Sequence, residues 1–194
     1  MTAMPDLPRT MTEAEYLAFE RGSDIKHEYI NGHVYAMTGA SGNHNLIVAS
    51  TISTLIAQTR GRSCSVFASD LRVRNPHSVN YFYPDVTVVC DEIQYTDDHM
   101  DTLANPTVIM EVLSPSTESD DRNIKFQNYW RIPSLQAYVL IAQDQARIER
   151  FTRQERDTWL LNVATGRDGN LPLPSIGATL ALADVYGQVR FENT

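Results

Sequence analysis

The sequence predicts an α+β domain, α/β-like in its order of elements, with a central mixed β-sheet flanked by helices. Short β-branched runs at 83–90 and 107–113 have the nearly continuous apolar character of buried strands. Apolar residues recur at helical spacing over 43–60. The elements follow in the order helix, hairpin, helix, three strands, helix and strands, as expected for one small domain.

The N-terminal part of the chain contains clear start and turn signals. Residues 1–10 are predicted to form a flexible tail, and a single domain is expected over 11–194. Thr12 and Glu15 form a capping-box pattern that opens a short helix. Asn-Gly at 31–32, between two apolar runs, predicts a β-hairpin.

Strands dominate the prediction after the long helix. An acidic loop at 91–105 separates the two β-branched runs, and a helix over 119–131 is expected to end before Pro133. The remaining predicted segments are strands at 65–74, 137–142, 147–152 and 159–163, a loop marked by Pro172, Pro174 and Gly177, and a closing segment around 180–185.

Composition and charge exclude several classes of protein. With 194 residues and 42% hydrophobic side chains, the chain can build one core. The net charge of -8 argues against coating nucleic acid by bulk electrostatics, although local contacts to phosphates stay open. No apolar run reaches the roughly 20 residues that span a bilayer, and the N-terminus lacks a signal-peptide pattern. Cys64 and Cys90 are expected to be small buried hydrophobes in a reducing compartment, so a cytoplasmic location is predicted.

Two acidic residues occupy positions that are costly for a charge. Asp85 stands at the head of one β-branched run, and Glu111 lies inside the next. Burying a carboxylate costs several kcal/mol unless a partner offsets it. A divalent cation shared by both acids is one such partner, and an arginine paired with Glu111 is another. From the residues alone, both interpretations stay open.

The helix after the second run carries a possible third member. Asp121 and Lys125 are four residues apart, so they share a helix face. They form either a surface ion pair or a group in which Lys125 reaches Glu111. Lysine occurs only at Lys26 and Lys125, which draws attention to both, although Lys26 is equally explained by compositional drift.

These residues form a recognisable spaced set. PDVTVV at 84–89, VIMEVLSPST at 108–117 and DRNIK at 121–125 resemble the Uma-two family of predicted restriction endonucleases, within the PD-(D/E)xK nuclease superfamily. The resemblance extends over nearly the whole chain through MTEAEYLAF at 11–19, HEYINGHVYAM at 27–37, SDLRV at 69–73 and LQAYVLI at 135–141. It implies a restriction-endonuclease-like core.

The resemblance also implies a metal site. Asp85, Glu111 and the main-chain carbonyl of Val112 match the ligands of a Mg²⁺ ion, for which Mn²⁺ can substitute. The superfamily lysine normally lies two residues after the second acid, where this chain has Leu113. The family instead places a lysine on the following helix, which matches Lys125.

Four further residues match recurrent family positions or neighbour the lysine, and are expected to support the site: Glu28, His44, Asp70 and Asp121. The candidates for contacts to backbone phosphates are Arg72, Arg74 and Arg122. Taken singly, each is better explained as a solvated surface arginine.

The predicted function is Mg²⁺-dependent hydrolysis of phosphodiester bonds in nucleic acid, with DNA as the expected substrate and no membrane partner. A homodimer is expected by analogy, because cutting two strands favours paired sites. One alternative is a binding module that keeps the nuclease fold without turnover. Another is an unrelated hydrolase with two carboxylates, such as a glycosidase, which needs no metal.

Overall fold

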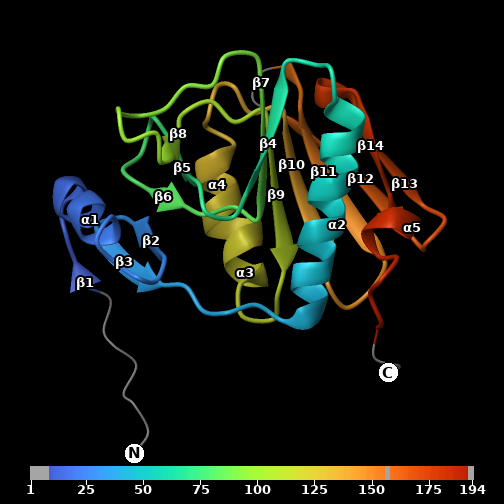
Figure 1. The fold of residues 1–194 in the computed structure, drawn as a ribbon, viewed down its shortest axis with the longest axis horizontal. Helices are drawn as coiled ribbons and strands as arrows, with labels where there is room; N and C mark the ends of the chain where they lie inside the picture. The colour runs from blue at the N-terminus through green and yellow to red at the C-terminus, as the bar shows by residue number, and fades with distance from the viewer. Residues whose placement is uncertain (1–8, 156–157, 192–194) are drawn as a thin grey trace, which may run out of the picture.

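The computed structural model describes residues 9–155 and 158–191, which form two six-stranded sheets, a two-stranded hairpin and the helices around them (Figure 1). The central sheet has the order β12 (Trp159–Thr165), β11 (Arg147–Arg153), β10 (Ala137–Ala142), β9 (Val108–Leu113), β7 (Val86–Cys90) and β4 (Cys64–Ala68). The N-terminal sheet has the order β1 (Arg9–Thr10), β3 (His33–Ala36), β2 (His27–Ile30), β6 (Tyr81–Phe82), β5 (Arg72–Arg74) and β8 (Thr102–Leu103). The hairpin is β13 (Asn170–Leu173) with β14 (Ala178–Ala181).

The helical segments are α1 (Glu13–Glu20), α2 (Gly42–Thr59), α3 (Glu118–Asp120), the π-helical turn η1 (Asp121–Lys125), α4 (Phe126–Tyr129), the 3-10 turn η3 (Pro174–Ile176) and α5 (Leu182–Val185). The predicted fold class is confirmed, because the central sheet is mixed and has helices on both faces. In that sheet β9 and β10 are parallel and the other neighbours are antiparallel.

The central sheet separates two apolar cores. Every residue of β9 and β10 is buried, as their continuous apolar runs predict. One face packs against Ile47 and Leu55 of α2. The other face packs against Tyr129 of α4 and the segment that follows it. Glu111 lies on this second face, because successive side chains of a strand alternate between faces.

The N-terminal signals are confirmed. The Thr12 side chain accepts the backbone N–H of Glu15 at the start of α1. The Glu15 side chain accepts the backbone N–H of Thr12, which completes the capping box. The hairpin of β2 and β3 turns at Asn31 and Gly32 with φ of 51° and 88°. Both values lie in the left-handed region that Asn-Gly adopts readily.

Several boundaries differ from the prediction, and three of them change which elements form. The segment 65–74 divides between the two sheets, because a turn at 69–71 separates β4 from β5. The last two residues of the predicted tail form β1 and pair with β3, whereas residues 1–8 lie outside the described residues. The predicted loop around Pro172 contains β13, in which proline is tolerated because the ribbon has only two strands and an open edge.

The cysteine interpretation is wrong. The register of β4 and β7 places Cys64 opposite Cys90, and a disulfide joins them, with 4.0 Å between the Cα atoms. Their separation of 26 residues gives no sign of this pairing without the strand register. The cysteines therefore no longer support a reducing compartment. Within the described part of the chain, no helix has both the length and the apolar composition that crossing a membrane requires.

Candidate active site

Asp85 and Glu111 come together because β7 and β9 are antiparallel neighbours. Val86 faces Met110 in the register, so Asp85 lies just beyond the ladder beside Glu111. The Asp85 carboxylate accepts the backbone N–H of Val112 at 2.7 Å, and the backbone N–H of Asp85 donates to Glu111 Oε2 at 3.4 Å. The expected convergence of the two acids on neighbouring strands is confirmed.

Lys125 reaches this pair from η1. Its Nζ lies 3.3 Å from Glu111 Oε1, 3.0 Å from Glu28 Oε1 and 3.1 Å from Asp121 Oδ1. The lysine side chain is only 7% exposed. The surface ion-pair interpretation is therefore wrong, and Lys125 joins a buried group with the three acids. We refer to Glu28, Asp85, Glu111, Asp121 and Lys125 as the acid cluster.

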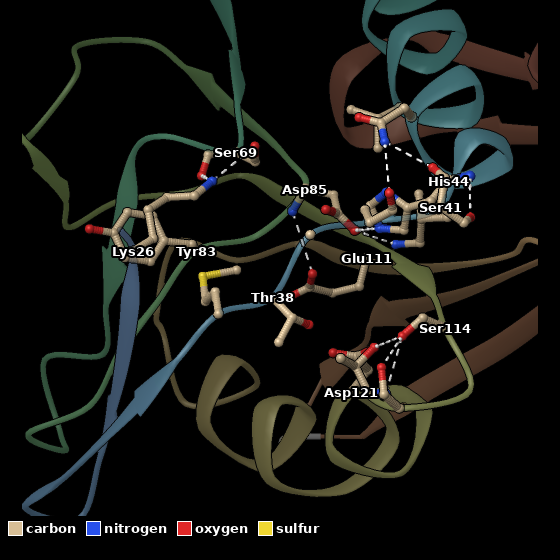
Figure 2. A pocket seen from close by; sticks show the side chains of 18 of the residues that line it. Lys26, Thr38, Ser41, His44, Ser69, Tyr83, Asp85, Glu111, Ser114 and Asp121 are labelled. Carbon is tan, nitrogen blue, oxygen red and sulfur yellow. Dashed lines mark hydrogen bonds and ion pairs between the residues drawn. The ribbon is translucent and has the colours of Figure 1, made fainter. Parts of the chain in front are cut away.

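His44 contacts the acid cluster from the first turn of α2. Ser41 caps this helix by accepting the backbone N–H of His44, which fixes the start of the helix beside the end of β9. The His44 Nε2 atom lies 3.1 Å from Asp85 Oδ2. Figure 2 shows His44 and Ser41 on one side of Asp85 and Glu111, with Lys26 and Tyr83 on the other.

Two tyrosines complete the surroundings, and the sequence reasoning did not identify them. The Tyr129 hydroxyl donates to Glu111 Oε1 at 3.1 Å, and the Tyr138 hydroxyl donates to the main-chain carbonyl of Asp121 at 2.9 Å. Tyr129 follows Lys125 by four residues, so helical spacing could have placed both on the face toward Glu111. Tyr138 carries no such signal, because only the sheet register brings it near.

The acid cluster contains four carboxylates and one ammonium. Burial raises the pKa of Glu111 well above its usual value, and the neighbouring acids raise it further against the opposing charge of Lys125. Burial likewise raises the pKa of Asp121. Although burial opposes it, the surrounding carboxylates hold the pKa of Lys125 well above its usual value. The cluster therefore has an excess of negative charge that favours binding a cation.

Other predicted residues lie outside the acid cluster. Asp70 is 89% exposed on its side chain and pairs with Lys26 at 2.9 Å. The three candidate arginines are not free surface groups. Arg72 pairs with Asp101 at 2.5 Å, Arg74 with Glu13 at 2.9 Å, and Arg122 with Glu149 at 2.8 Å. Their guanidinium groups serve the fold, and none of the three lines the cavity described next.

A cavity of about 730 Å³ opens over the acid cluster. Asp85, Glu111, Asp121 and Lys125 contribute to its wall, together with His44 and Val112. The wall is built from the segments 24–26 and 37–41, the first turns of α2, the segments 69–70 and 83–85, the end of β9 and the turn before α3 (Figure 2). The size of the cavity suits part of a ligand rather than a single ion.

The residues fit a hard cation bound by oxygen. Glu28 Oε1 and Asp121 Oδ1 are buried without a hydrogen-bond partner in the described structure, and each lies within ion-pair distance of Lys125. Among the described residues, no three histidine, cysteine or acidic side chains already form a ligand set for a metal ion. Asp85, Glu111 and Val112 lie in the same cavity wall, and two carboxylates with one carbonyl are donors of the kind that Mg²⁺ commonly uses together with water.

The fold of this chain is shared with a solved structure. A solved structure described as a "putative nuclease belonging to DUF820", from Anabaena variabilis, superposes with a TM-score of 0.75. The match covers 91% of this chain and 98% of the other at 20% identity, so it establishes the shared α+β fold.

The family follows from the sequence match. The family model Uma2, described as "Putative restriction endonuclease", matches residues 13–183, and the chain belongs to this family. The resemblance seen in the spaced motifs is thereby confirmed. Two proteins from Synechocystis sp. are similar to this chain. "Uncharacterized protein sll1609" is 37% identical over 84% of this chain and 92% of its own length, and "Uncharacterized protein slr1290" is 34% identical over 93% of this chain and 94% of its own length.

Proposed function

We propose that this protein is a metal-dependent endonuclease that hydrolyses phosphodiester bonds of nucleic acid, with DNA as its substrate. The observation that carries the proposal is the convergence of Asp85, Glu111 and Lys125 at the wall of one cavity. Two acids on neighbouring strands with a lysine in contact match the chemistry of phosphodiester cleavage. Membership of a family described as "Putative restriction endonuclease" supports the same conclusion.

Asp85, Glu111 and the main-chain carbonyl of Val112 would hold the ion, which is Mg²⁺, with Mn²⁺ as a substitute. When bound, such an ion lowers the pKa of water and neutralises charge that develops on phosphate. The acid cluster contributes to this by having more carboxylates than its single ammonium can balance.

The residues around these ligands fix their orientation. His44 and the Val112 N–H both contact Asp85 Oδ2, which leaves Oδ1 for other partners. Tyr129 and Lys125 contact Glu111 Oε1, and the Asp85 N–H donates to Oε2 over a longer distance of 3.4 Å. Lys125 then lies beside the reacting phosphate, where its ammonium can orient a water molecule or stabilise transition-state charge.

The test is calorimetric titration of Mg²⁺ and Mn²⁺ into the protein, followed by a plasmid-nicking assay. Glu111→Ala is expected to abolish metal binding and nicking, because it removes one of two carboxylate ligands. Glu92→Ala, in the exposed acidic loop, removes the same charge away from the cavity and is expected to retain both. Lys125→Arg keeps the charge and is expected to bind metal with reduced nicking.

Two outcomes would overturn the proposal. Absence of metal binding by the wild type, even with an oligonucleotide present, excludes the mechanism. Metal binding without cleavage of DNA or RNA supports the alternative, a nuclease-fold binding module without turnover. The expected homodimer stays a prediction, which the sedimentation mass of the same sample tests against the 21.9 kDa of one chain.

A further inference from the structure

The cations of this chain are distributed unevenly around the cavity. The sequence contains two lysines among 16 basic residues, and both lysines line the cavity. None of the arginine side chains that the structure describes lines it. The three arginines that the sequence offered for phosphate contacts are held by internal carboxylates. A polyanionic ligand entering the cavity therefore finds the two lysines as its cationic partners.

The two lysines differ in accessibility. Lys125 is 7% exposed and surrounded by carboxylates, whereas the side chain of Lys26 is 35% exposed at the rim. Figure 2 shows Lys26 to one side of Asp85 and Glu111, opposite His44 and Ser41. Lys125 therefore lies within the acid cluster, at the proposed reacting centre. Lys26 is accessible to a ligand group that lies beside that centre.

Lys26 is also held in a defined position. Its Nζ donates to the carbonyl of Ser69 at 3.0 Å and lies 5.5 Å from the centre of the Tyr83 ring. It pairs with Asp70 at 2.9 Å, but that carboxylate is largely exposed. Exposed ion pairs contribute little, so a phosphate oxygen can take the place of Asp70 at small cost. The ammonium is oriented before a ligand arrives.

We propose that Lys26 forms a second phosphate-binding position, which holds a backbone phosphate next to the one that is cleaved. This inference rests on the proposed nuclease function and extends it. The cavity wall carries five carboxylates, from Asp24, Asp70, Asp85, Glu111 and Asp121. A nucleic-acid strand is repelled by them unless a cation meets each phosphate nearby. Lys26 supplies that cation on the side of the cavity where the described residues offer no other.

The test measures binding of labelled single-stranded and duplex DNA by fluorescence anisotropy as a function of salt. Ca²⁺ replaces Mg²⁺ so that no cleavage occurs. Lys26→Gln is expected to weaken binding about five- to tenfold and to reduce the salt slope by about one contact. Asp70→Asn is expected to tighten binding, because it removes the competitor for Lys26. Arg131→Gln, an exposed cation away from this cavity, controls for net charge.

The outcomes separate this inference from the proposed function. If the wild type binds DNA and Lys26→Gln binds equally well with the same salt slope, only the Lys26 position is overturned. An equal loss in Arg131→Gln assigns the effect to net charge and also overturns it. If the wild type binds no nucleic acid at all, the proposed function fails and the inference fails with it. Thermal unfolding of each variant shows that the fold is retained.

Discussion

Two charge networks of this protein, one buried and one partly exposed, differ in their balance of positive and negative charges. The acid cluster sets four carboxylates against the single ammonium of Lys125. In the second network, which we refer to as the arginine cluster, Arg21 pairs with Asp97 and Asp101, and Arg72 pairs with Asp101. The arginine cluster is balanced, with two cations and two anions.

The balance decides how each network behaves. In the acid cluster, burial and like charges raise the pKa of Glu111. In the arginine cluster, hydrogen bonds from Arg21 and Arg72 outweigh partial burial and lower the pKa of Asp101. A balanced network stabilises the fold by itself, since it ties α1 to the acidic loop and to β5. An unbalanced network that lines a cavity favours the binding of a further cation. This property is typical of a functional site.

The largest expected effect on stability comes from removing the only cation of the acid cluster. Lys125→Met leaves Glu28, Glu111 and Asp121 buried beside one another without an opposite charge. We expect the free energy of unfolding to fall by about 3–5 kcal/mol, as when one partner of a buried ion pair is removed. Urea denaturation at pH 7 measures it.

A second substitution shows whether repulsion is the cause. Glu111→Gln in the Lys125→Met background removes one of the repelling carboxylates, so the double variant is expected to lose less stability than Lys125→Met alone. Equal losses in the two would show that packing of the lysine stem, and not charge balance, stabilises this region.

The next effect in size concerns the arginine cluster and pH. Asp101→Asn is expected to cost about 1–2 kcal/mol at pH 7, because two arginines lose their ionised partner. The pKa of Asp101 is lower in the folded state, so its contribution is fully present above the unfolded value of about 3.9 and is lost progressively as the pH falls from there through the lower folded-state pKa. The difference from the wild type should therefore shrink in acid.

Urea denaturation at pH 7 and at a series of pH values that descends from the unfolded pKa checks this, with Asp98→Asn as control. Asp98 is an exposed neighbour on the same loop, and its substitution is expected to change little at either pH. A difference between Asp101→Asn and the wild type that does not shrink at all as the pH is lowered would contradict the assigned role of the carboxylate. Metal binding should stay unaffected, because Asp101 lies outside the cavity wall.

Local sequence patterns, together with the family resemblance, predicted the main elements of the fold and the residues of the acid cluster. They did not predict the arginine cluster or the disulfide. A charge in or at the head of a β-branched run is costly, which draws attention to Asp85 and Glu111. Helical spacing pairs Lys125 only with Asp121, and the family resemblance is what assigns Lys125 to the site. The arginine partners and the disulfide were missed for one common reason. Each depends on how segments distant in the sequence are registered, as when Arg72 meets Asp101 through the pairing of β5 with β8. Local periodicity carries no information about that register.

The smallest expected effect tests whether the neighbours of Glu111 act in function or only in packing. Tyr129→Phe removes one of the two donors to Glu111 Oε1 and keeps the ring. Stability is expected to change by about 1 kcal/mol, because Lys125 still contacts that oxygen. Metal-dependent nicking is expected to fall about tenfold, because the carboxylate is less well oriented when its Oε1 atom is held by one donor instead of two. Tyr138→Phe is the matched control, since its hydroxyl binds the Asp121 carbonyl and does not contact Glu111. That variant should lose comparable stability while nicking at close to the wild-type rate. Equal nicking by the two variants would assign Tyr129 to packing alone, and would limit the groups that orient Glu111 to Lys125 and the Asp85 backbone.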